Sequence, residues 1–207
     1  NDGDMWMATG FGLSELNPRN QRFRHYNKLH GLAGNLHNRP AYAKISSGEL
    51  AFGSTEGLTI FDPDKIVRNT HVPPVVITEF KLFNHVAEIG REGSPLQQSI
   101  TTTKAITLDY NQAVFSIEFA ALNYNFAGMN KYAYQLEGFD TDWNYVGARR
   151  TATYTNLDPG EYRFSVKASN NEGVWNDIGT SLTIHILPPA WLTWWAYTFY
   201  GFIAMLI

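Results

Sequence analysis

The stretch NKYAYQLEGFDTDWNYVGARRTATYTNLDPGEYRFSVKASNNEGVW, residues 130–175, decides the fold of this chain. Its first arm places Tyr132, Tyr134 and Leu136 on one face, and its last arm places Tyr162, Phe164, Val166 and Ala168 on one face. Lys131, Gln135 and Glu137 lie on the other face of the first arm, and Glu161, Arg163, Ser165 and Lys167 on the other face of the last arm. This alternation has a period of two, which is typical of β-strands that bury one face and leave the other in water. A helical spacing would instead bring charge into the core.

The corner between these arms, Leu157 to Tyr162, carries a more specific signal. Pro159 presets the first turn position, and Gly160 is expected to take the positive φ angle that follows. Tyr162 then enters the next strand, where its ring is expected to be buried while its hydroxyl bonds to nearby backbone. This tyrosine corner is typical of immunoglobulin-like β-sandwiches.

Further strands are predicted on both sides of this stretch, at Val75–Asn84, Ala105–Leu108, Ala113–Leu122 and Ser181–Leu187. Residues 85–103 are polar and predict a hairpin or loop. Together this makes about seven short strands, the number and spacing of an immunoglobulin- or fibronectin-like sandwich. We therefore predict an all-β fold.

The first seventy residues contain an internal repeat whose copies lie 45 positions apart, as Gly3 and Gly48 show. At the same offset Gly12-Leu13 matches Gly57-Leu58, Thr9 matches Ser54, and Asn17-Pro18 matches Asp62-Pro63. A repeat of 40–50 residues built from short strands is typical of β-propeller blades. Two copies are too few to close a ring. We therefore expect the last blades of a longer propeller.

Composition and charge exclude several classes of function. The formal net charge is −3, from 16 basic and 19 acidic residues, which argues against nucleic acid as a main partner. Cysteine is absent, so a disulfide framework, a thiolate metal site and a cysteine nucleophile are excluded.

Two boundaries divide the chain into three predicted segments. Val72-Pro73-Pro74 predicts a stiff linker, because paired prolines favour extended backbone. The C-terminal run AWLTWWAYTFYGFIAMLI, residues 190–207, carries no charge and is nearly long enough to span a bilayer. We predict propeller blades at 1–72, a sandwich at 73–188 and the start of a transmembrane helix at 189–207, with both ends of the sequence lying inside a longer protein. A buried apolar helix or strand is the alternative for the last segment.

These motifs resemble a known arrangement of families. Trp6 to Pro18 and Phe52 to Pro63 are similar to the two-component regulator propeller repeat, although the first half of its signature is looser here. The tyrosine-rich stretch closely resembles the Y_Y_Y domain, in the pattern from Tyr132-x-Tyr134-x-Leu136 to Asn170-x-x-Gly173-x-Trp175. Pro188-Pro189-Ala190-Trp191, with Trp194-Trp195, matches that family's entry into its transmembrane helix. The resemblance covers nearly the whole chain.

The resemblance implies the periplasmic sensor region of a two-component histidine kinase, often a hybrid one. It implies a segment on the extracytoplasmic side of the bacterial inner membrane, anchored by one membrane helix. It also implies an extracellular ligand, with oligosaccharides as one class, and we expect further propeller blades to supply most of its contacts. We hypothesise in addition that two copies of the chain form a homodimer through the sandwich. The segment itself is not expected to be an enzyme, and we predict no catalytic, cofactor-binding or metal site. The ligand-binding residues stay unknown.

Three groups of residues could carry chemistry, and each has a structural interpretation. Asp140 to Asn144 opens like a calcium loop, but Tyr145 occupies its glycine position, which favours a polar turn. The six histidines, at 25, 30, 37, 71, 85 and 185, show no paired-ligand spacing. The rings of Trp143, Tyr145 and Trp175 could stack on a sugar, but capping of the sandwich core is the favoured interpretation.

Two other functions stay open from the sequence. One is a membrane-anchored fibronectin-type module for adhesion or carbohydrate binding, which the same alternating strands would serve. The other is an accessory domain of a secreted glycosidase, for which the sequence offers no paired-carboxylate cleft.

Overall fold

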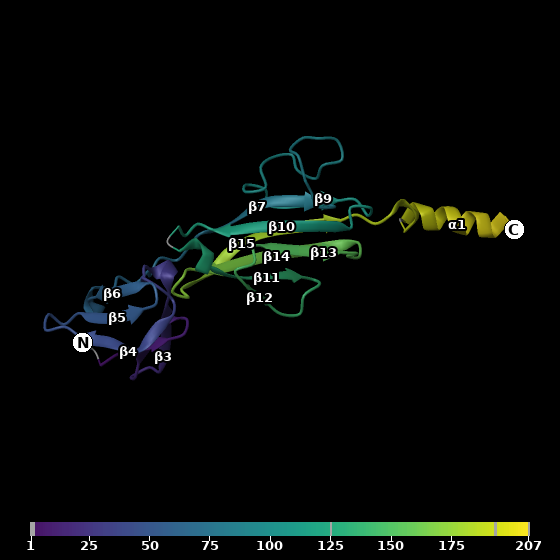
Figure 1. Cartoon of the computed structure of the whole chain (residues 1–207). Helices are drawn as coiled ribbons and strands as arrows, with labels where there is room; N and C mark the ends of the chain where they lie inside the picture. Colours follow the sequence, from purple (N-terminus) through teal and green to yellow (C-terminus); the bar gives the residue numbers. More distant parts are fainter. Residues whose placement is uncertain (1–2, 125, 193, 207) are drawn as a thin grey trace. The chain divides into compact units, whose positions relative to one another are not determined.

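The computed structural model describes residues 3–124, 126–192 and 194–206 and divides the chain into two compact units, Asn1–Arg68 and Asn69–Ile207. Strands dominate both units (Figure 1), so the prediction of a predominantly β chain is confirmed. Each unit is described by itself below.

The first unit consists of two antiparallel three-stranded sheets. The first sheet has the order β1 (Met5–Thr9), β2 (Gly12–Asn17), β3 (Arg22–Tyr26), and the second has the order β4 (His37–Lys44), β5 (Leu50–Ser54), β6 (Gly57–Phe61). Short 3₁₀ turns follow at Lys28–His30 and Pro63–Lys65.

The predicted repeat reappears in the hydrogen bonds of the two sheets. β1 and β5 begin 45 positions apart, and so do β2 and β6. The Thr9 hydroxyl donates to Gly12 O at 2.9 Å, and the Ser54 hydroxyl donates to Gly57 O at the same distance. Both hairpins are therefore closed by the same side-chain bond, across a glycine with positive φ.

A small aromatic core holds the two sheets of the first unit together. Leu13 and Phe52 are buried at its centre. Trp6 stacks on Tyr26 with ring centroids 5.2 Å apart and meets Phe61 edge-on at 4.8 Å. Aromatic contacts of this kind contribute to stability beyond the area that they bury. Trp6, on the first sheet, thus connects that sheet to Phe61 of the second.

The second unit contains two further sheets. One has the order β13 (Thr151–Thr155), β10 (Val114–Ala121), β7 (Val75–Leu82), β8 (His85–Val86). The other has the order β12 (Asn144–Gly147), β11 (Lys131–Glu137), β14 (Gly160–Ser169), β15 (Trp175–Ile186), β9 (Ala105–Leu108). β9 runs parallel to β15, whereas the other pairs are antiparallel. Helix α1 (Trp194–Leu206) follows a short turn at Ala190–Leu192.

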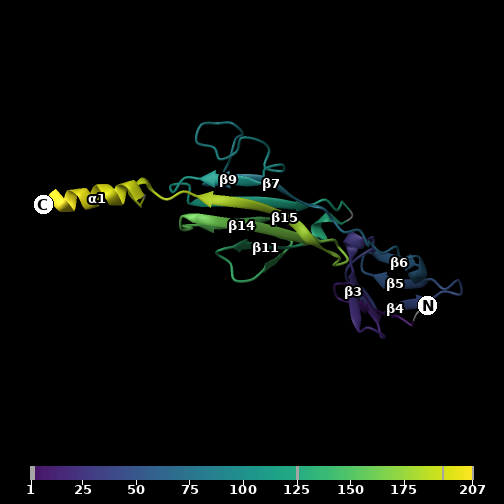
Figure 2. The same cartoon turned by 180° about the vertical axis from the view of Figure 1, so that it is seen from behind.

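These two sheets form two layers around one apolar core, as the views from both sides show (Figures 1 and 2). The alternation in residues 130–175 predicts most of its members, since Tyr132, Leu136, Phe164, Val166 and Ala168 are almost completely buried. Tyr134, predicted on the same face, is only partly buried. Sheet β13–β8 contributes Phe80, Phe115, Ile117 and Phe119 from the opposite layer. Leu96 and Ile100, from the loop predicted at 85–103, also enter the core. That loop is therefore anchored in the core as well as crossing the surface.

The tyrosine corner forms as the sequence predicts. The ring of Tyr162 is buried, and its hydroxyl donates to Asp158 O at 2.9 Å. Gly138 lies against this ring, because a Cβ built there would come within 3.1 Å of Tyr162 Cδ1. The corner thereby closes one end of the core.

One detail of the predicted corner is wrong. Gly160 does not adopt a positive φ angle; it is the first residue of β14 and pairs with Ile186 of β15, so its backbone belongs to the sheet. The positive φ at this corner, +53°, belongs to Asn156 instead. Asparagine is one of the few side chains that tolerates the left-handed region, so the chain reverses before the Pro-Gly pair.

Strand β15 begins with a bulge that sets its pairing with β14. The register shifts between Val166 and Ala168, opposite residues 176–180. Gly179 has a φ of +58°, and a Cβ on it would lie 2.2 Å from Val166 O. The backbones approach so closely that only glycine fits this position.

Replacing Gly179 by alanine tests the importance of this bulge. We expect Gly179→Ala to lower the free energy of unfolding by about 3 kcal/mol, because the methyl group clashes with backbone that cannot move aside. Gly173→Ala is the matched control, since Gly173 also has positive φ but open space around it, and its cost is about 1 kcal/mol. Urea denaturation of both variants measures the difference. Equal losses would show that the close approach to Val166 does not constrain the strand.

Candidate functional site

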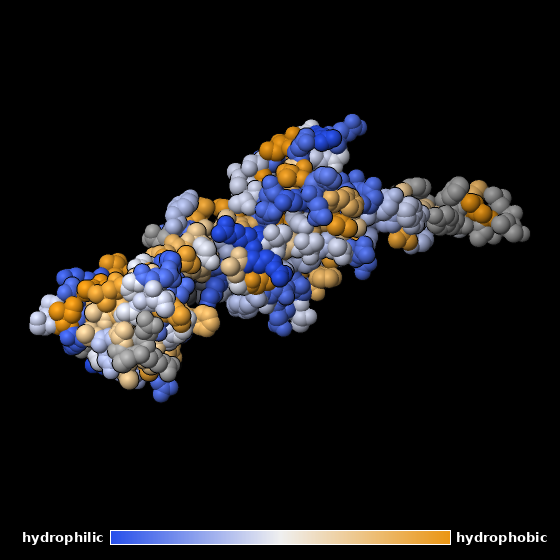
Figure 3. All heavy atoms as spheres, in the orientation of Figure 1, coloured by the Kyte–Doolittle hydropathy of each residue, from blue (hydrophilic) through white to orange (hydrophobic). Residues whose placement is uncertain are grey.

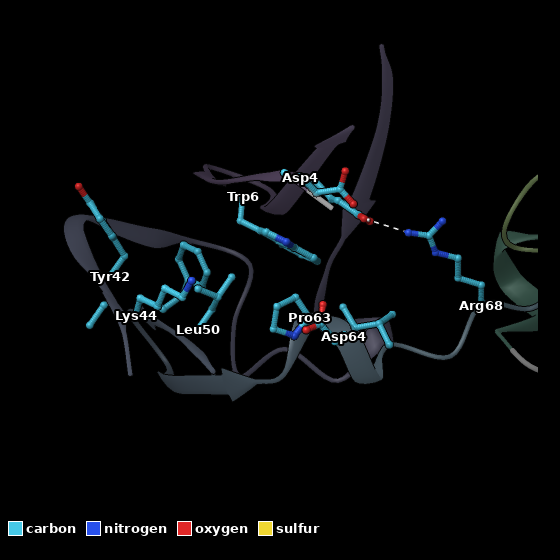
Figure 4. A pocket seen from close by; sticks show the side chains of 13 residues that line it. Asp4, Trp6, Tyr42, Lys44, Leu50, Pro63, Asp64 and Arg68 are labelled. Carbon is cyan, nitrogen blue, oxygen red and sulfur yellow. Dashed lines mark hydrogen bonds and ion pairs between the residues drawn. The ribbon is translucent and has the colours of Figure 1, made fainter. Parts of the chain in front are cut away.

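The first unit contains a cleft of about 580 Å³ between its two sheets (Figure 4). Its apolar walls come from Trp6, Leu50, Phe52, Pro63 and Ile66, and its polar lining from Asp4, Glu15, Tyr42, Lys44, Asp64 and Arg68. The residues 63–68 that line one side continue directly into the predicted linker. The cleft is thus mixed in polarity and includes the last residue of the first unit.

Glu15 is the buried centre of an ion-pair network beside this cleft. Its side chain is 5% exposed, and Arg68 Nη2 lies 3.2 Å from Glu15 Oε1. Arg24 Nη1 lies 3.6 Å from Glu15 Oε2, to which the Tyr26 hydroxyl donates at 2.8 Å. A buried carboxylate needs this number of partners to offset its desolvation, so Glu15 ties Arg68 to the first sheet.

Asp4 presents a carboxylate oxygen to the same cleft (Figure 4). Its Oδ1 atom is buried and has no hydrogen-bond partner among the described residues. Buried polar atoms without partners are uncommon and costly, so Asp4 is suited to accept a hydrogen bond from a group that enters the cleft.

In the second unit, the buried side chain of Asn170 holds the predicted linker. Its Nδ2 atom donates to Asn69 O and to His71 O, both at 2.8 Å. Its Oδ1 atom accepts from Glu172 N at 2.9 Å and Val174 N at 3.0 Å. One amide therefore joins the linker to the turn between β14 and β15.

Asn69 adds a second set of bonds to the same clamp. Its Nδ2 atom donates to Asn171 Oδ1 at 2.8 Å and to Asn123 Oδ1 at 3.2 Å. Asn123 in turn donates to Asn130 Oδ1 at 2.8 Å, and both of these residues are buried. The asparagine ladder thus reaches from the linker into the core layer.

The prolines of the linker are held through their carbonyl groups. Asn176 Nδ2 donates to Pro73 O at 2.9 Å, and Leu122 N donates to Pro74 O at 2.8 Å. These bonds add to the proline rings as a possible source of the stiffness that the sequence predicts for Val72-Pro73-Pro74, which stays a prediction. We call residues 69–74 with Asn170 and Asn176 the linker clamp.

The three rings considered for sugar stacking come together on the second unit. Lys167 Nζ lies 4.6 Å from the ring centroid of Trp143, 5.9 Å from that of Tyr145 and 5.7 Å from that of Trp175. Tyr145 and Trp175 also meet edge-on at 5.6 Å. The protein's own lysine thus makes a cation–π contact with Trp143 at the centre of this group of rings.

The calcium-like loop is a structural turn. Asp140 Oδ2 accepts from Leu136 N at 2.7 Å and from the Tyr154 hydroxyl at 3.0 Å. Burial, followed by the nearby Asp140 carboxylate, raises the pKa of Tyr154, so its hydroxyl stays protonated as a donor. Within the described residues, no group of three or more His, Asp or Glu side chains could hold a metal ion.

The histidines are dispersed in the structure. His25 Nδ1 lies 2.8 Å from the Ser14 hydroxyl, His30 takes part in the cap at Asn27, and His185 lies 3.8 Å from Glu161. His37 is buried, and its Nε2 atom has no partner among the described residues.

The C-terminal exit of the second unit is also tied to its sheet. Leu187 N donates to Leu108 O at 2.9 Å, and the ring of Trp191 meets Tyr110 edge-on at 5.1 Å. Helix α1 is 13 residues long. Among the described residues, no helix has the length and apolarity needed to cross a bilayer. The side chains of Trp194 and Trp195 lie outside the described part.

Comparison with protein families assigns the second unit. The Y_Y_Y domain model matches residues 123–187, which include Asn123, Asn130, Asn170 and the tyrosine corner. The second unit contains a Y_Y_Y domain. The resemblance predicted from the motif is thereby confirmed.

Relatives extend the likeness to nearly the whole chain. Histidine kinase P4 from Formosa agariphila is 36% identical over 198 residues, which cover 96% of this chain and 14% of that protein. The extracellular domain of a hybrid two-component system from B. thetaiotaomicron superposes with a TM-score of 0.75 at 29% identity, over 91% of this chain and 25% of that one. A further extracellular domain from the same organism shares the fold at 24% identity, with a TM-score of 0.53 over 94% of this chain and 25% of its own. The chain is therefore similar to sensor regions of two-component signalling systems and spans a small part of those proteins.

Replacing Asn170 by alanine tests the linker clamp. The change removes four part-buried hydrogen bonds and leaves their backbone partners without the amide, so we expect a loss of about 3 kcal/mol in the free energy of unfolding. Asn111→Ala is the control, because Asn111 is an exposed turn residue, and we expect a change below about 0.5 kcal/mol. Thermal and urea unfolding measure both values. A cost for Asn170→Ala as small as that of the control would refute the clamp.

Proposed function

We propose that the chain is an extracytoplasmic sensor segment that links a ligand-binding β-propeller to a membrane helix and a cytoplasmic output domain. The observation that carries this proposal is the linker clamp, which binds residues 69–74 to the second unit through the amides of Asn170 and Asn176. A binding module on a flexible stalk would have no use for a bound linker, whereas a transmitting segment needs one.

The relatives support the sensor role. One is named a histidine kinase, and one solved relative is the extracellular domain of a hybrid two-component system. This likeness supports a location on the extracytoplasmic side of a bacterial inner membrane. The output domain is then a histidine kinase, and this segment itself carries no catalysis.

The first unit is proposed to form the C-terminal blades of a propeller, within residues 1–72. Its 45-residue repeat supports this assignment, and so does its surface. Phe23 on β3 and Leu58 and Ile60 on β6 are at least half exposed, and Figure 3 shows apolar residues on the visible face of this unit. Blades of a propeller bury such faces against neighbouring blades.

Residues 73–188 are proposed to form an immunoglobulin-like sandwich, and residues 189–207 the start of a single membrane-spanning helix. The tyrosine corner and the two layers support the first assignment. The uncharged sequence after Pro188-Pro189 supports the second.

Two partners complete the proposal. A second copy of the chain would pack through the sandwich, so that a change in the propellers alters the spacing of two membrane helices. The ligand is extracellular, with oligosaccharides as one class, and further blades supply most of its contacts. Such coupling requires that the ligand favours one arrangement over the other.

Labelling in whole cells tests the location and the output together. Thr155 is exposed on β13, and a Thr155→Cys variant of the full-length protein should react with a membrane-impermeant maleimide before lysis. Membranes that contain the protein should also transfer phosphate from ATP to it. Labelling of the Thr155→Cys variant only after lysis, or membranes without autophosphorylation, would overturn the proposal.

A further inference from the structure

The two sheets of the first unit pack against each other through different faces. Residues that pair across neighbouring strands share one face of a sheet, and successive residues alternate between its faces. On the first sheet, the face toward the shared core carries Trp6, Ala8 and Leu13. On the second sheet, the face toward the core carries Leu50, Phe52 and Phe61. Each sheet therefore contributes one apolar face to the core.

The 45-residue repeat shows that these two faces are not equivalent. Leu58 occupies the repeat position of Leu13, and Gly53 occupies that of Ala8. Gly53 and Leu58 pair with each other on the face of the second sheet that points away from the core, since the next residue, Phe52, points into it. The two sheets are thus stacked head to tail. The face that the first sheet uses for packing is left uncovered on the second.

We call this uncovered face of the second sheet the outer face; it carries Ala51, Gly53, Leu58 and Ile60. Leu13 is 1% exposed, whereas Leu58 at the same repeat position is 62% exposed. Glu15 is 4% exposed, whereas Ile60 at its repeat position is 50% exposed. The repeat positions agree and the exposure differs, because the second sheet covers this face of the first.

The outer face is apolar and shallow. Ala51 occupies the repeat position of Trp6, so the face lacks the large indole that fills the core of this unit. Gly53 has no room for a side chain, because a Cβ built there would lie 2.9 Å from Ala41 Cβ. Large and small side chains alternate across well-packed layers. A partner of the outer face must therefore bring large apolar side chains, as Phe52 does in the core.

We propose that the outer face is a docking surface for another sheet of the same repeat, supplied by a further part of the same chain in the full-length protein. That sheet approaches with the face that corresponds to Phe52, so the head-to-tail stacking inside the first unit continues. The inference rests on the proposed function for the source of this sheet, since it takes the first unit as part of a propeller.

The same chain is favoured over a second copy as the source of this sheet. A head-to-tail contact between copies leaves one face uncovered at each end, so it keeps adding copies unless the stack closes into a ring. Repeats within one chain close such a ring without any association. This chain covers 25% of the solved extracellular domain and 14% of histidine kinase P4, which leaves length for further repeats in proteins of this kind.

Thiol reactivity tests whether the outer face is covered. This chain has no cysteine, so Leu58→Cys places a single probe on the face, in the full-length protein with any other cysteines replaced. Leu29→Cys is the matched control, because Leu29 is a leucine of nearly equal exposure, 63%, in the turn Lys28–His30. We expect Leu58→Cys to react with a maleimide at least about tenfold more slowly than Leu29→Cys, and both to react equally in urea.

The source of the covering sheet is tested by dilution and by cross-linking. A partner within the same chain keeps Leu58→Cys protected from about 10 µM down to about 10 nM protein, because no association is involved. The photo-reactive residue p-benzoylphenylalanine in place of Leu58 should then form a cross-link inside one chain. Peptide mapping should locate that cross-link in a segment with the same 45-residue repeat.

Three results would overturn the inference. The first is a Leu58→Cys thiol that reacts as fast as Leu29→Cys in the folded protein; should Leu58→Cys fail to fold, Ile60→Cys on the same face decides. The second is protection that disappears on dilution, which means a second copy. The third is a cross-link to a segment outside the repeat. None of these measurements depends on membrane location or phosphate transfer, so the sensor role and the covered face can fail separately.

Discussion

The side-chain amide of Asn170 is the interaction on which the arrangement of the second unit depends. A neutral amide offers two N–H donors and two acceptor positions, and Asn170 uses all four on backbone groups. Two of these groups belong to the linker and two to the turn before β15. No other residue type of this size presents donors and acceptors in this way. The linker is therefore fixed to the same turn from which β15 begins.

Strand β15 extends this connection across the second unit. It starts beside the linker clamp, where Asn176 holds Pro73, and it ends at Ile186, next to the exit residue Leu187. The bulge at Gly179 prevents the strand from slipping against β14. A displacement that reaches the linker thus acts on a strand in fixed register with its neighbours. Packed elements of this kind move as bodies and do not deform gradually, which suits a segment that transmits.

The parts of this structure that depend on local patterns could be predicted from the sequence. The alternation around Tyr132 and Phe164 reports which face is buried, and the Pro-Gly corner reports the turn before Tyr162. The 45-residue repeat predicts matching hairpins, because the turn residues Thr9 and Ser54 make the same bond in each. These signals lie within a few residues of the feature that they predict.

Interactions between distant residues could not be predicted in this way. Asn69 and Asn170 are about a hundred positions apart. Asn170 belongs to the Y_Y_Y pattern, but the pattern does not say which groups its amide binds, and Asn69 is one of many loop asparagines. The prolines indicated a stiff linker but not what holds it. Trp143, Tyr145 and Trp175 were recognised as a set, yet the lysine between them was not, because Lys167 looks like an ordinary solvent-facing residue of an alternating strand. The ion pair between Glu15 and Arg68 could not be predicted either, because the two residues lie 53 positions apart in the sequence.

The most direct test of this account is the mobility of the linker in solution. Backbone ¹⁵N relaxation at Thr70, His71 and Val72 reports their order parameters on the picosecond-to-nanosecond timescale. A clamped linker predicts values of about 0.85, equal to those of the strands, and a clear drop in the Asn170→Ala variant. Values below about 0.6 in the unaltered chain would mean a flexible tether, and the second unit could not then receive a displacement through residues 69–74.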